Sequence, residues 1–203
     1  LYTIGHSNHS TENFLGLLSK HDITAVCDVR SQPYSKFNPQ FNRENIQKDL
    51  KQSNIAYVFL GRELGPRSDD PACYIGGQVQ YHLLAATEIF QEGLERLVKG
   101  MQFYRIAMMC AEKDPIMCHR MILVCRHLRK EVDAIRHILE DGSIEALADS
   151  EDRLLRHLKI PALQLFDSTE NLIVRAYDIQ GEKIAYGSQN NNQNRNHDGI
   201  DDL

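Results

Sequence analysis

Tryptophan, long apolar runs and a surplus of basic residues are all missing from this chain. Without tryptophan, its 8 tyrosines and 7 phenylalanines offer few rings on which single-stranded nucleic acid could stack. The longest apolar run falls well short of the ~20 residues of a membrane helix, and the apolar start at residues 1–4 is too short for a secretory leader. Lys and Arg total 23 against 28 Asp and Glu, and the resulting net charge of -5 repels polyanions. We therefore expect a cytoplasmic protein without membrane contact, which could bind nucleic acid only through a local basic patch.

The dense cysteine spacing of a secreted disulfide framework is missing too. The five cysteines form an odd, sparse set: Cys27, Cys73, Cys110, Cys118 and Cys125. We expect reduced thiols. Cys27 lies in an apolar run and Cys125 on an apolar helix stripe, so both are expected in the core, whereas Cys73 is expected to be exposed in a polar loop.

What is present fits one compact domain. The chain has 203 residues, of which 42% are hydrophobic, which is enough for a substantial core. We expect a single α/β domain over residues 1–186. Residues 187–203 are polar and aperiodic, so they are expected to form a flexible tail.

Short apolar runs alternate with helical patterns along the chain. Strands are expected at residues 2–5, 23–29, 55–60, 105–110 and 132–139. Helices are expected at residues 11–20, 42–53, 80–99 and 118–130, followed by a helix at 149–160 and a strand near 172–179. This order predicts a three-layer α/β sandwich, in which helices flank a mostly parallel, Rossmann-like sheet.

Polar side chains follow four of the expected strands. His6 and Ser7 follow the first strand, Asp28 and Arg30 end the second, and Cys110 and Glu112 end the fourth, while Gly61, Arg62 and Glu63 follow the third. Because ligands bind where the carboxyl ends of parallel strands open into a crevice, we expect these groups to converge on one site. Asp28 and Arg30 could form a structural ion pair, or could act separately as a base and an anion clamp.

The loop at residues 31–41 is long enough to cover that site. Tyr34 and Lys36 in this loop could contact a substrate, and Phe41 could cover it or plug the space beneath the loop.

The segment from Cys110 to Arg120 carries the densest chemistry. Cys118, His119 and Arg120 are expected to begin a helix, where free amides and neighbouring positive charge would lower the pKa of Cys118. Cys110 is a candidate nucleophile or a structural thiol. Seven residues separate the two cysteines, a spacing unlike that of common zinc motifs. If a divalent metal binds, we expect His6, Cys118, His119 and a carboxylate to hold it.

Several ordered motifs resemble the bacterial domain of unknown function 488 family over roughly residues 1–160. The matching segments are Tyr2-Thr3-Ile4-Gly5-His6-Ser7, Asp28-Val29-Arg30-Ser31, Pro33-Tyr34-Ser35, Asn38-Pro39-Gln40-Phe41, Cys110-Ala111-Glu112 and Cys118-His119-Arg120. Arg62 stands where the Leu-Gly-Gly region of that family has its second glycine. The resemblance implies a three-layer α/β domain with these strand-end residues, but no reaction is generally assigned to the family.

The leading hypothesis is an enzyme that acts on an anionic substrate, such as a phosphorylated compound, a nucleotide or a nucleic-acid end. Five residues are candidate catalytic groups: His6, Asp28, Glu112, Cys118 and His119. Five others are candidate substrate-binding groups: Ser7, Arg30, Tyr34, Lys36 and Arg120.

Three alternatives stay open: cysteine-based sulfur chemistry, a metal-dependent enzyme, and a non-enzymatic ligand-binding or nucleic-acid-associated domain. A local basic patch for nucleic acid could come from Arg126, Arg129 and Lys130. We interpret these three residues as a solvated helix face.

Overall fold

The computed structural model describes residues 1–161 and 168–187. Its centre is a six-stranded sheet in the order β3-β2-β6-β1-β7-β8. The strands are β1 (Tyr2–Gly5), β2 (Ala25–Asp28), β3 (Ala56–Phe59), β6 (Ile106–Cys110), β7 (Arg136–Ile138) and β8 (Ile144–Ala146). The first five run parallel and β8 is antiparallel to β7. The predicted fold class is confirmed.

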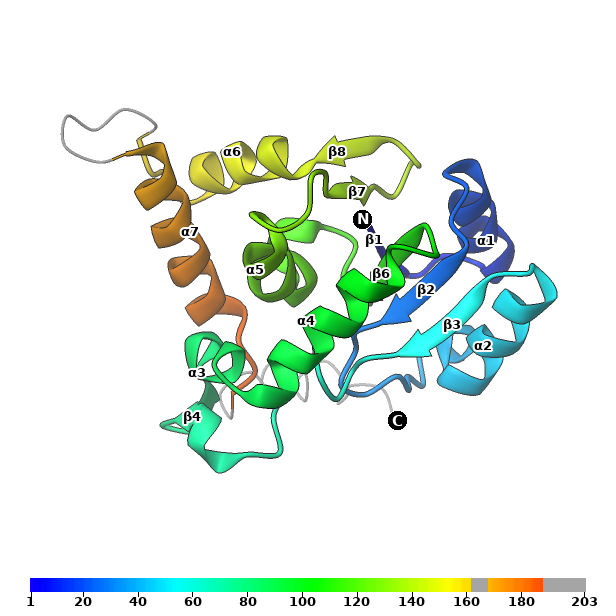
Figure 1. Cartoon of the computed structure of the whole chain (residues 1–203), viewed down its shortest axis with the longest axis horizontal. Helices are drawn as coiled ribbons and strands as arrows, with labels where there is room; N and C mark the ends of the chain where they lie inside the picture. Colours follow the sequence, from blue (N-terminus) through cyan, green and yellow to red (C-terminus); the bar gives the residue numbers. More distant parts are fainter. Residues whose placement is uncertain (162–167, 188–203) are drawn as a thin grey trace, which may run out of the picture.

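Helices cover both faces of this sheet (Figure 1). On one face, α1 (Thr11–Lys20) and α2 (Arg43–Gln52) bury their apolar residues in a smaller core. The other face carries a larger core with α3 (Tyr81–Ala85), α4 (Glu88–Gly100), the π-helix η4 (Arg120–Cys125), α5 (Arg126–Leu128), α6 (Leu147–His157) and α7 (Thr169–Ile184).

Successive residues of β6 alternate between these two cores. Ile106, Met108 and Cys110 belong to the larger core, whereas Ala107 and Met109 belong to the smaller one. Since side chains alternate across a strand, the last residue of each strand has a defined face. Cys110 therefore faces α4 and η4.

Two expectations about helices are wrong, and both errors come from missed capping residues. One helix was expected at residues 80–99, but Thr87 accepts a hydrogen bond from the Phe90 amide and starts α4 as a new helix after α3. A strand was expected near residues 172–179, but this segment lies in α7, which Ser168 caps by accepting from the Asn171 amide.

The expected final strand at residues 132–139 is shorter than predicted and forms a hairpin with the unpredicted β8. Gly142 has a φ of 76° and lies in the reversing turn, where the Leu139 amide donates to the Ser143 carbonyl. The Asp141-Gly142 pair is a common hairpin signal that could have indicated this reversal.

Cys73 is buried in the larger core, so its expected exposure is wrong. The reason is a short 3-10 turn, η2 (Pro71–Cys73), followed by the unpredicted hairpin of β4 (Tyr74–Ile75) and β5 (Gln78–Val79), which fold the loop back on α3.

Of the tail expected at 187–203, Gly187 pairs with Gln78, and residues 188–203 lie outside the described residues. Within the described ranges, the helices are either too short or too polar to cross a membrane.

Candidate functional site

The strand-end residues gather where β1, β2 and β6 end. Beyond the strands the main chains stay paired, because the amides of His6 and Ser7 donate to the carbonyls of Cys110 and Ala111 at 2.8 and 2.9 Å. A Cβ atom on Gly5 would clash with the carbonyl oxygen of Glu112, so only glycine allows this close approach. The pairing brings the loop after β6 over the end of β1.

Two polar clusters form at this edge, one for each face of the sheet. The His6–Arg30 cluster, on the α1–α2 face, comprises His6, Asp28, Arg30, Phe41 and Tyr57. The thiol cluster, on the α4–η4 face, comprises Cys110, Glu112, Cys118 and His119.

A buried ion pair organises the His6–Arg30 cluster. Nε and one terminal nitrogen of Arg30 donate to the two carboxylate oxygens of Asp28 at 2.9 and 2.6 Å. The Tyr57 hydroxyl donates to the same carboxylate at 2.8 Å. Asp28 is 0% and Arg30 is 7% exposed. Of the two alternatives for these residues, the structure therefore shows the structural ion pair and not a separate base and anion clamp.

His6 is held neutral beside this pair. Nε2 of His6 accepts from Arg30 at 3.1 Å, its Nδ1 donates to the carbonyl of Ser7 at 2.9 Å, and its ring stacks on Phe41. Burial, followed by the charge of Arg30, lowers the pKa of His6 to about 4. Both ring nitrogens therefore have partners within the protein.

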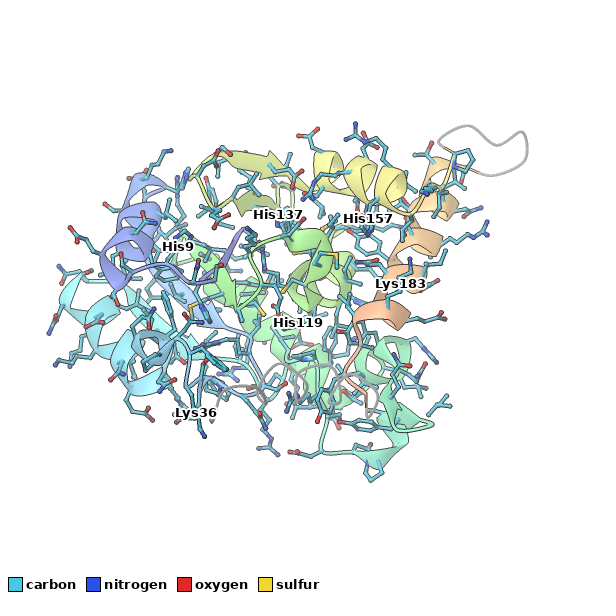
Figure 2. All side chains as sticks on the ribbon, turned by 180° about the vertical axis from the view of Figure 1, so that it is seen from behind. His9, Lys36, His119, His137, His157 and Lys183 are labelled. Carbon is cyan, nitrogen blue, oxygen red and sulfur yellow. The ribbon has the colours of Figure 1, made fainter. Side chains whose placement is uncertain are left out.

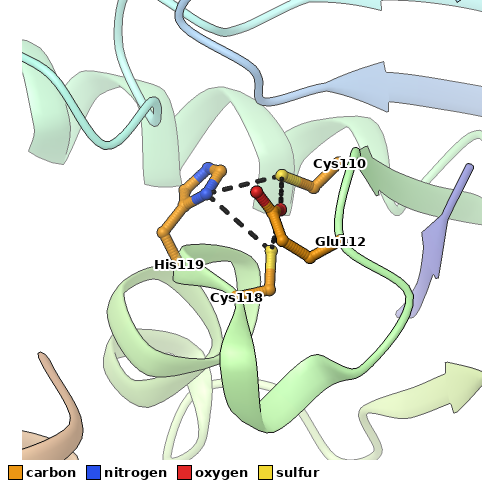
Figure 3. Close-up of side chains that lie close together, drawn as sticks. All are labelled: Cys110, Glu112, Cys118 and His119. Atoms are coloured by element: carbon orange, nitrogen blue, oxygen red, sulfur yellow. Dashed lines mark hydrogen bonds between the residues drawn. The ribbon is translucent and has the colours of Figure 1, made fainter. Parts of the chain in front are cut away.

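The thiol cluster brings four groups together that can all bind protons or metal ions (Figure 3). Oε2 of Glu112 lies 2.8 Å from Sγ of Cys110 and 3.0 Å from Sγ of Cys118. Nδ1 of His119 lies 3.5 and 3.8 Å from the same two sulfur atoms. All four donor atoms lie within 4.8 Å of one another.

A compact turn produces this convergence. Asp114 caps the 3-10 turn η3 (Pro115–Met117) by accepting from the Ile116 amide, and the turn returns the chain to the end of β6. Cys118 is extended and precedes η4, so the helix expected at residues 118–130 begins two residues later, as a π-helix. The Arg120 amide donates to Sγ of Cys118 at 3.4 Å, which places this sulfur at the start of the helix.

Arg120 is fully buried behind the thiol cluster. Its two terminal nitrogens donate to the carbonyls of Glu112 and Lys113, and its Nε donates to Thr3 Oγ1 at 3.2 Å. Because all three nitrogens contact protein oxygens, this placement favours a positioning role over the expected contact with an anion.

The pKa values of the two thiols move in opposite directions. Burial, followed by the neighbouring Cys118, raises the pKa of Cys110. Burial also opposes ionisation of Cys118, but the hydrogen bond from Cys110 and the charges of Arg120 and His119 outweigh it and lower the pKa. The lowered pKa of Cys118 agrees with the prediction from sequence, and its greater reactivity stays a prediction.

The charge of Cys118 also shifts the pKa values of His119 and Glu112, which lie beside the thiols. Burial lowers the pKa of His119, but the Cys118 charge outweighs it, so the net shift is upward. The residue as a whole is exposed, but loss of water around its carboxylate, followed by the Cys118 charge, raises the pKa of Glu112.

A pocket of about 150 Å³ opens above the thiol cluster and is lined by Arg30, Arg67, Cys110, Glu112 and His119, among others. His6 and Asp28 are not in its lining, so the expectation that all the strand-end groups share one pocket is only partly met. The pocket shares Ser31, Gln32 and Arg67 with a neighbouring pocket of about 340 Å³.

Arg120 and three other expected substrate-binding residues lie outside the small pocket. Tyr34 is 57% exposed, and its hydroxyl donates to Glu44 at 2.7 Å. Lys36 lies at the margin of the molecule, whereas His119 lies in its interior (Figure 2). Ser7 donates to the side chain of Asn8. Phe41 is buried beneath the loop, as its plug interpretation predicts.

Two expectations drawn from side-chain chemistry need correction. The candidate metal ligands in the described residues include Cys110 in place of His6, because both His6 nitrogens have partners on the other face of the sheet. Arg126, Arg129 and Lys130 are not a freely solvated face, since they pair with three carboxylates: Asp178, Glu151 and Glu170.

Arg67 is the charged residue of the pocket lining that was not predicted from the sequence. It follows the Leu64-Gly65-Pro66 segment after β3, and its guanidinium lies 3.9 Å from the ring centroid of Tyr186. The signal available was its place after a parallel strand that ends at the same sheet edge. Arg62, which replaces an expected glycine, is exposed and has no positive φ, so its backbone does not require glycine.

The fold and the two clusters define a three-layer α/β protein whose buried polar and thiol side chains gather where the parallel strands end. Within that class, the chain belongs to the family described as Domain of unknown function DUF488, whose sequence model matches residues 10–126. The matched segment contains Asp28, Arg30 and the whole thiol cluster, while His6 precedes it. No curated protein and no solved structure matches the chain significantly.

Proposed function

We propose that this protein is an enzyme that acts on a small anionic compound bound above the thiol cluster. One observation carries the proposal: Cys110, Glu112 and His119 line the same pocket as Arg67, which has no carboxylate partner among the described residues. A cation beside groups that can transfer protons or attack a substrate is the arrangement that anion chemistry requires.

Arg67 is the cation best placed for the substrate. Asp28 neutralises Arg30, and Arg120 directs its nitrogens to backbone and Thr3 oxygens. In a chain with a net charge of -5, an unpaired guanidinium at a pocket wall distinguishes this place from the surrounding surface.

The dimensions favour a substrate with a small reactive end. A volume of about 150 Å³ is below the range of ~300–1,000 Å³ that is typical of pockets for drug-sized ligands. The adjoining pocket of about 340 Å³ is lined by Phe59 and Arg62 and also by Asp69 and Asp70, so it could hold an uncharged part of a nucleotide-sized molecule. Arg67 lines both pockets, so it could hold an anionic group between the two parts of such a substrate.

Glu112 is best placed to move a proton. Its carboxylate contacts both sulfur atoms, and the residue is exposed, whereas Cys110, Cys118 and His119 are buried. A general acid or base needs contact with the reacting group first and a suitable pKa second. Glu112 meets the geometric requirement between pocket and cluster.

Thiol chemistry is the second candidate, favoured by the contact of Cys118 with His119 at the start of η4. Access argues against it, because Cys110 is 2% and Cys118 1% exposed. Reactive cysteines generally need partial exposure.

Thermal unfolding in the presence of inorganic phosphate, sulfate and a panel of nucleotides tests the anion proposal. A ligand present at a hundred times its dissociation constant should stabilise the fold by about 2.7 kcal/mol. Arg67→Ala should remove the rise in melting temperature, and Arg67→Lys should retain part of it.

Arg156→Ala, on the exposed face of α6, is the matched control, because it removes the same charge from a residue that lines neither pocket. Each variant is compared with its own ligand-free transition. If no anion in the panel shifts the wild-type transition, or if both alanine variants weaken the shift equally, the proposal fails. An anion that binds without any turnover would instead support the non-enzymatic alternative.

A further inference from the structure

The donor atoms of the thiol cluster have the composition and arrangement of a metal site. Two sulfurs, one imidazole nitrogen and one carboxylate oxygen lie within 4.8 Å of one another. Thiolate and imidazole ligands together favour zinc among the common divalent ions, and zinc is usually bound by four such ligands in a tetrahedron. We infer that Cys110, Cys118, His119 and Glu112 bind one divalent transition-metal ion, and that zinc is the ion that this donor set fits.

The orientation of His119 supports this inference independently of the distances. Nε2 of His119 donates to the carbonyl of Val29 at 2.9 Å, which leaves the Nδ1 lone pair of the neutral ring directed at both sulfur atoms. Histidines that bind metals usually donate their other N–H to a carbonyl or carboxylate in this way. The imidazole is therefore already oriented as a ligand.

The surroundings of the sulfur atoms point the same way. The Arg120 amide contacts Sγ of Cys118, and the Arg120 side chain fixes the Glu112–Lys113 backbone at the edge of the cluster. Two thiols and a carboxylate held this close need protons or a cation among them. A divalent cation would replace the thiol protons and satisfy all three acidic groups at once.

The burial pattern also gives the site an open side. Cys110, Cys118 and His119 are buried, while Glu112 is exposed and, with Cys110 and His119, lines the pocket. Catalytic zinc sites typically have three protein ligands and a fourth position for water or substrate. Glu112 is thus the ligand that water or a substrate would displace, and this last step alone rests on the proposed enzymatic function.

Cobalt(II) titration of the reduced, chelator-treated protein tests the site, because thiolate–cobalt bonds produce an intense charge-transfer absorption in the near ultraviolet. The wild-type protein should bind one cobalt ion per chain with this absorption, and zinc should displace it, since zinc binds such sites more tightly. Cys110→Ser and Cys118→Ser should each remove about half of the absorption per bound ion, because each removes one of two sulfur ligands.

Cys125→Ser is the matched control, since Cys125 lies on η4 with its thiol in the core and outside the cluster. It should leave the absorption unchanged. Glu112→Gln should retain the sulfur absorption with a changed visible spectrum. The wild-type spectrum keeps the test decisive even if a serine variant fails to fold.

Absence of sulfur–cobalt absorption in the wild type, or its persistence at full strength in both Cys110→Ser and Cys118→Ser, would overturn the inference. The result is separable from the anion proposal, because Arg67→Ala should leave the cobalt spectrum unaltered. Cobalt binding without any anion binding would retain the metal site and reject the proposed substrate.

Discussion

The His6–Arg30 cluster and the thiol cluster occupy the same sheet edge but differ in how their charges are balanced. In the first, Asp28 faces Arg30, and His6 accepts from Arg30, so opposite or complementary groups are paired throughout. In the second, two thiols and Glu112 crowd together with His119, the one member of this cluster that can carry a positive charge. We therefore propose that the first cluster supports the backbone at the site and that the second is the place where chemistry occurs.

The pKa shifts of the two histidines express this difference. Burial and Arg30 lower the pKa of His6, whereas the charge of Cys118 raises that of His119 against the effect of burial. Both imidazoles are buried, so the sign of the neighbouring charge accounts for the opposite directions of their pKa shifts.

The largest expected change in stability comes from breaking the ion pair of the His6–Arg30 cluster. Asp28→Ala leaves the guanidinium of Arg30 buried without its partner, which should lower the free energy of unfolding by about 3–5 kcal/mol. Urea denaturation measures the change. Glu95→Ala is the control, because it breaks an ion pair with Lys99 in which both side chains are exposed, and it should change stability by only ~0.5 kcal/mol. Similar small losses in both variants would refute the supporting role of the His6–Arg30 cluster.

The next largest change in stability is expected from metal binding at the thiol cluster. If the thiol cluster binds zinc in the folded state alone, free zinc at a hundred times its dissociation constant should stabilise the chelator-treated protein by about 2.7 kcal/mol. Calorimetric melting with and without zinc checks this, with Cys110→Ser as the variant expected to show a smaller shift, because it loses one of the two sulfur ligands. Equal stabilisation of wild type and variant would place the zinc elsewhere.

Acid should destabilise the folded protein through His6 in the His6–Arg30 cluster. The pKa of His6 is about 4 in the folded protein against ~6.5 unfolded, so its contribution is complete above pH 6.5 and is lost as pH falls toward 4. Stability should fall by up to about 1.4 kcal/mol per pH unit within that window through this residue. His6→Gln, which keeps an acceptor for Arg30, should flatten the slope in pH-dependent urea denaturation. An unchanged slope would mean that His6 does not titrate as its surroundings imply.

Much of the fold follows from the sequence because apolar runs and helical stripes identify the elements, and parallel pairing then fixes the sheet. The same patterns also place four site residues at the strand ends: Asp28, Arg30, Cys110 and Glu112. The assignment to opposite faces could not be predicted, because one residue of register decides which face a strand-end side chain occupies. The Arg120 side chain donates hydrogen bonds to protein oxygens from all three of its nitrogens, and these bonds depend on the path of the 110–114 loop. No local sequence pattern indicates that path.

The smallest expected effect lies at the junction of the clusters. Ser7 has a φ of 46°, and its amide joins the loop after β6. Ser7→Gly should relieve this strain and stabilise the protein by about 0.5–1 kcal/mol. Ser19→Gly, the same change near the end of helix α1, should destabilise it by a similar amount. Thermal denaturation that shows the same sign for both changes would contradict this interpretation.

Zinc K-edge X-ray absorption of the zinc-loaded protein tests the division between the clusters most directly. We expect two sulfur ligands at about 2.3 Å and two nitrogen or oxygen ligands at about 2.0–2.2 Å. The spectrum of His6→Gln should be indistinguishable from that of the wild type, because His6 belongs to the supporting cluster. A shell without sulfur, or a ligand set that changes in His6→Gln, would contradict the claim that the thiol cluster alone is the chemical centre.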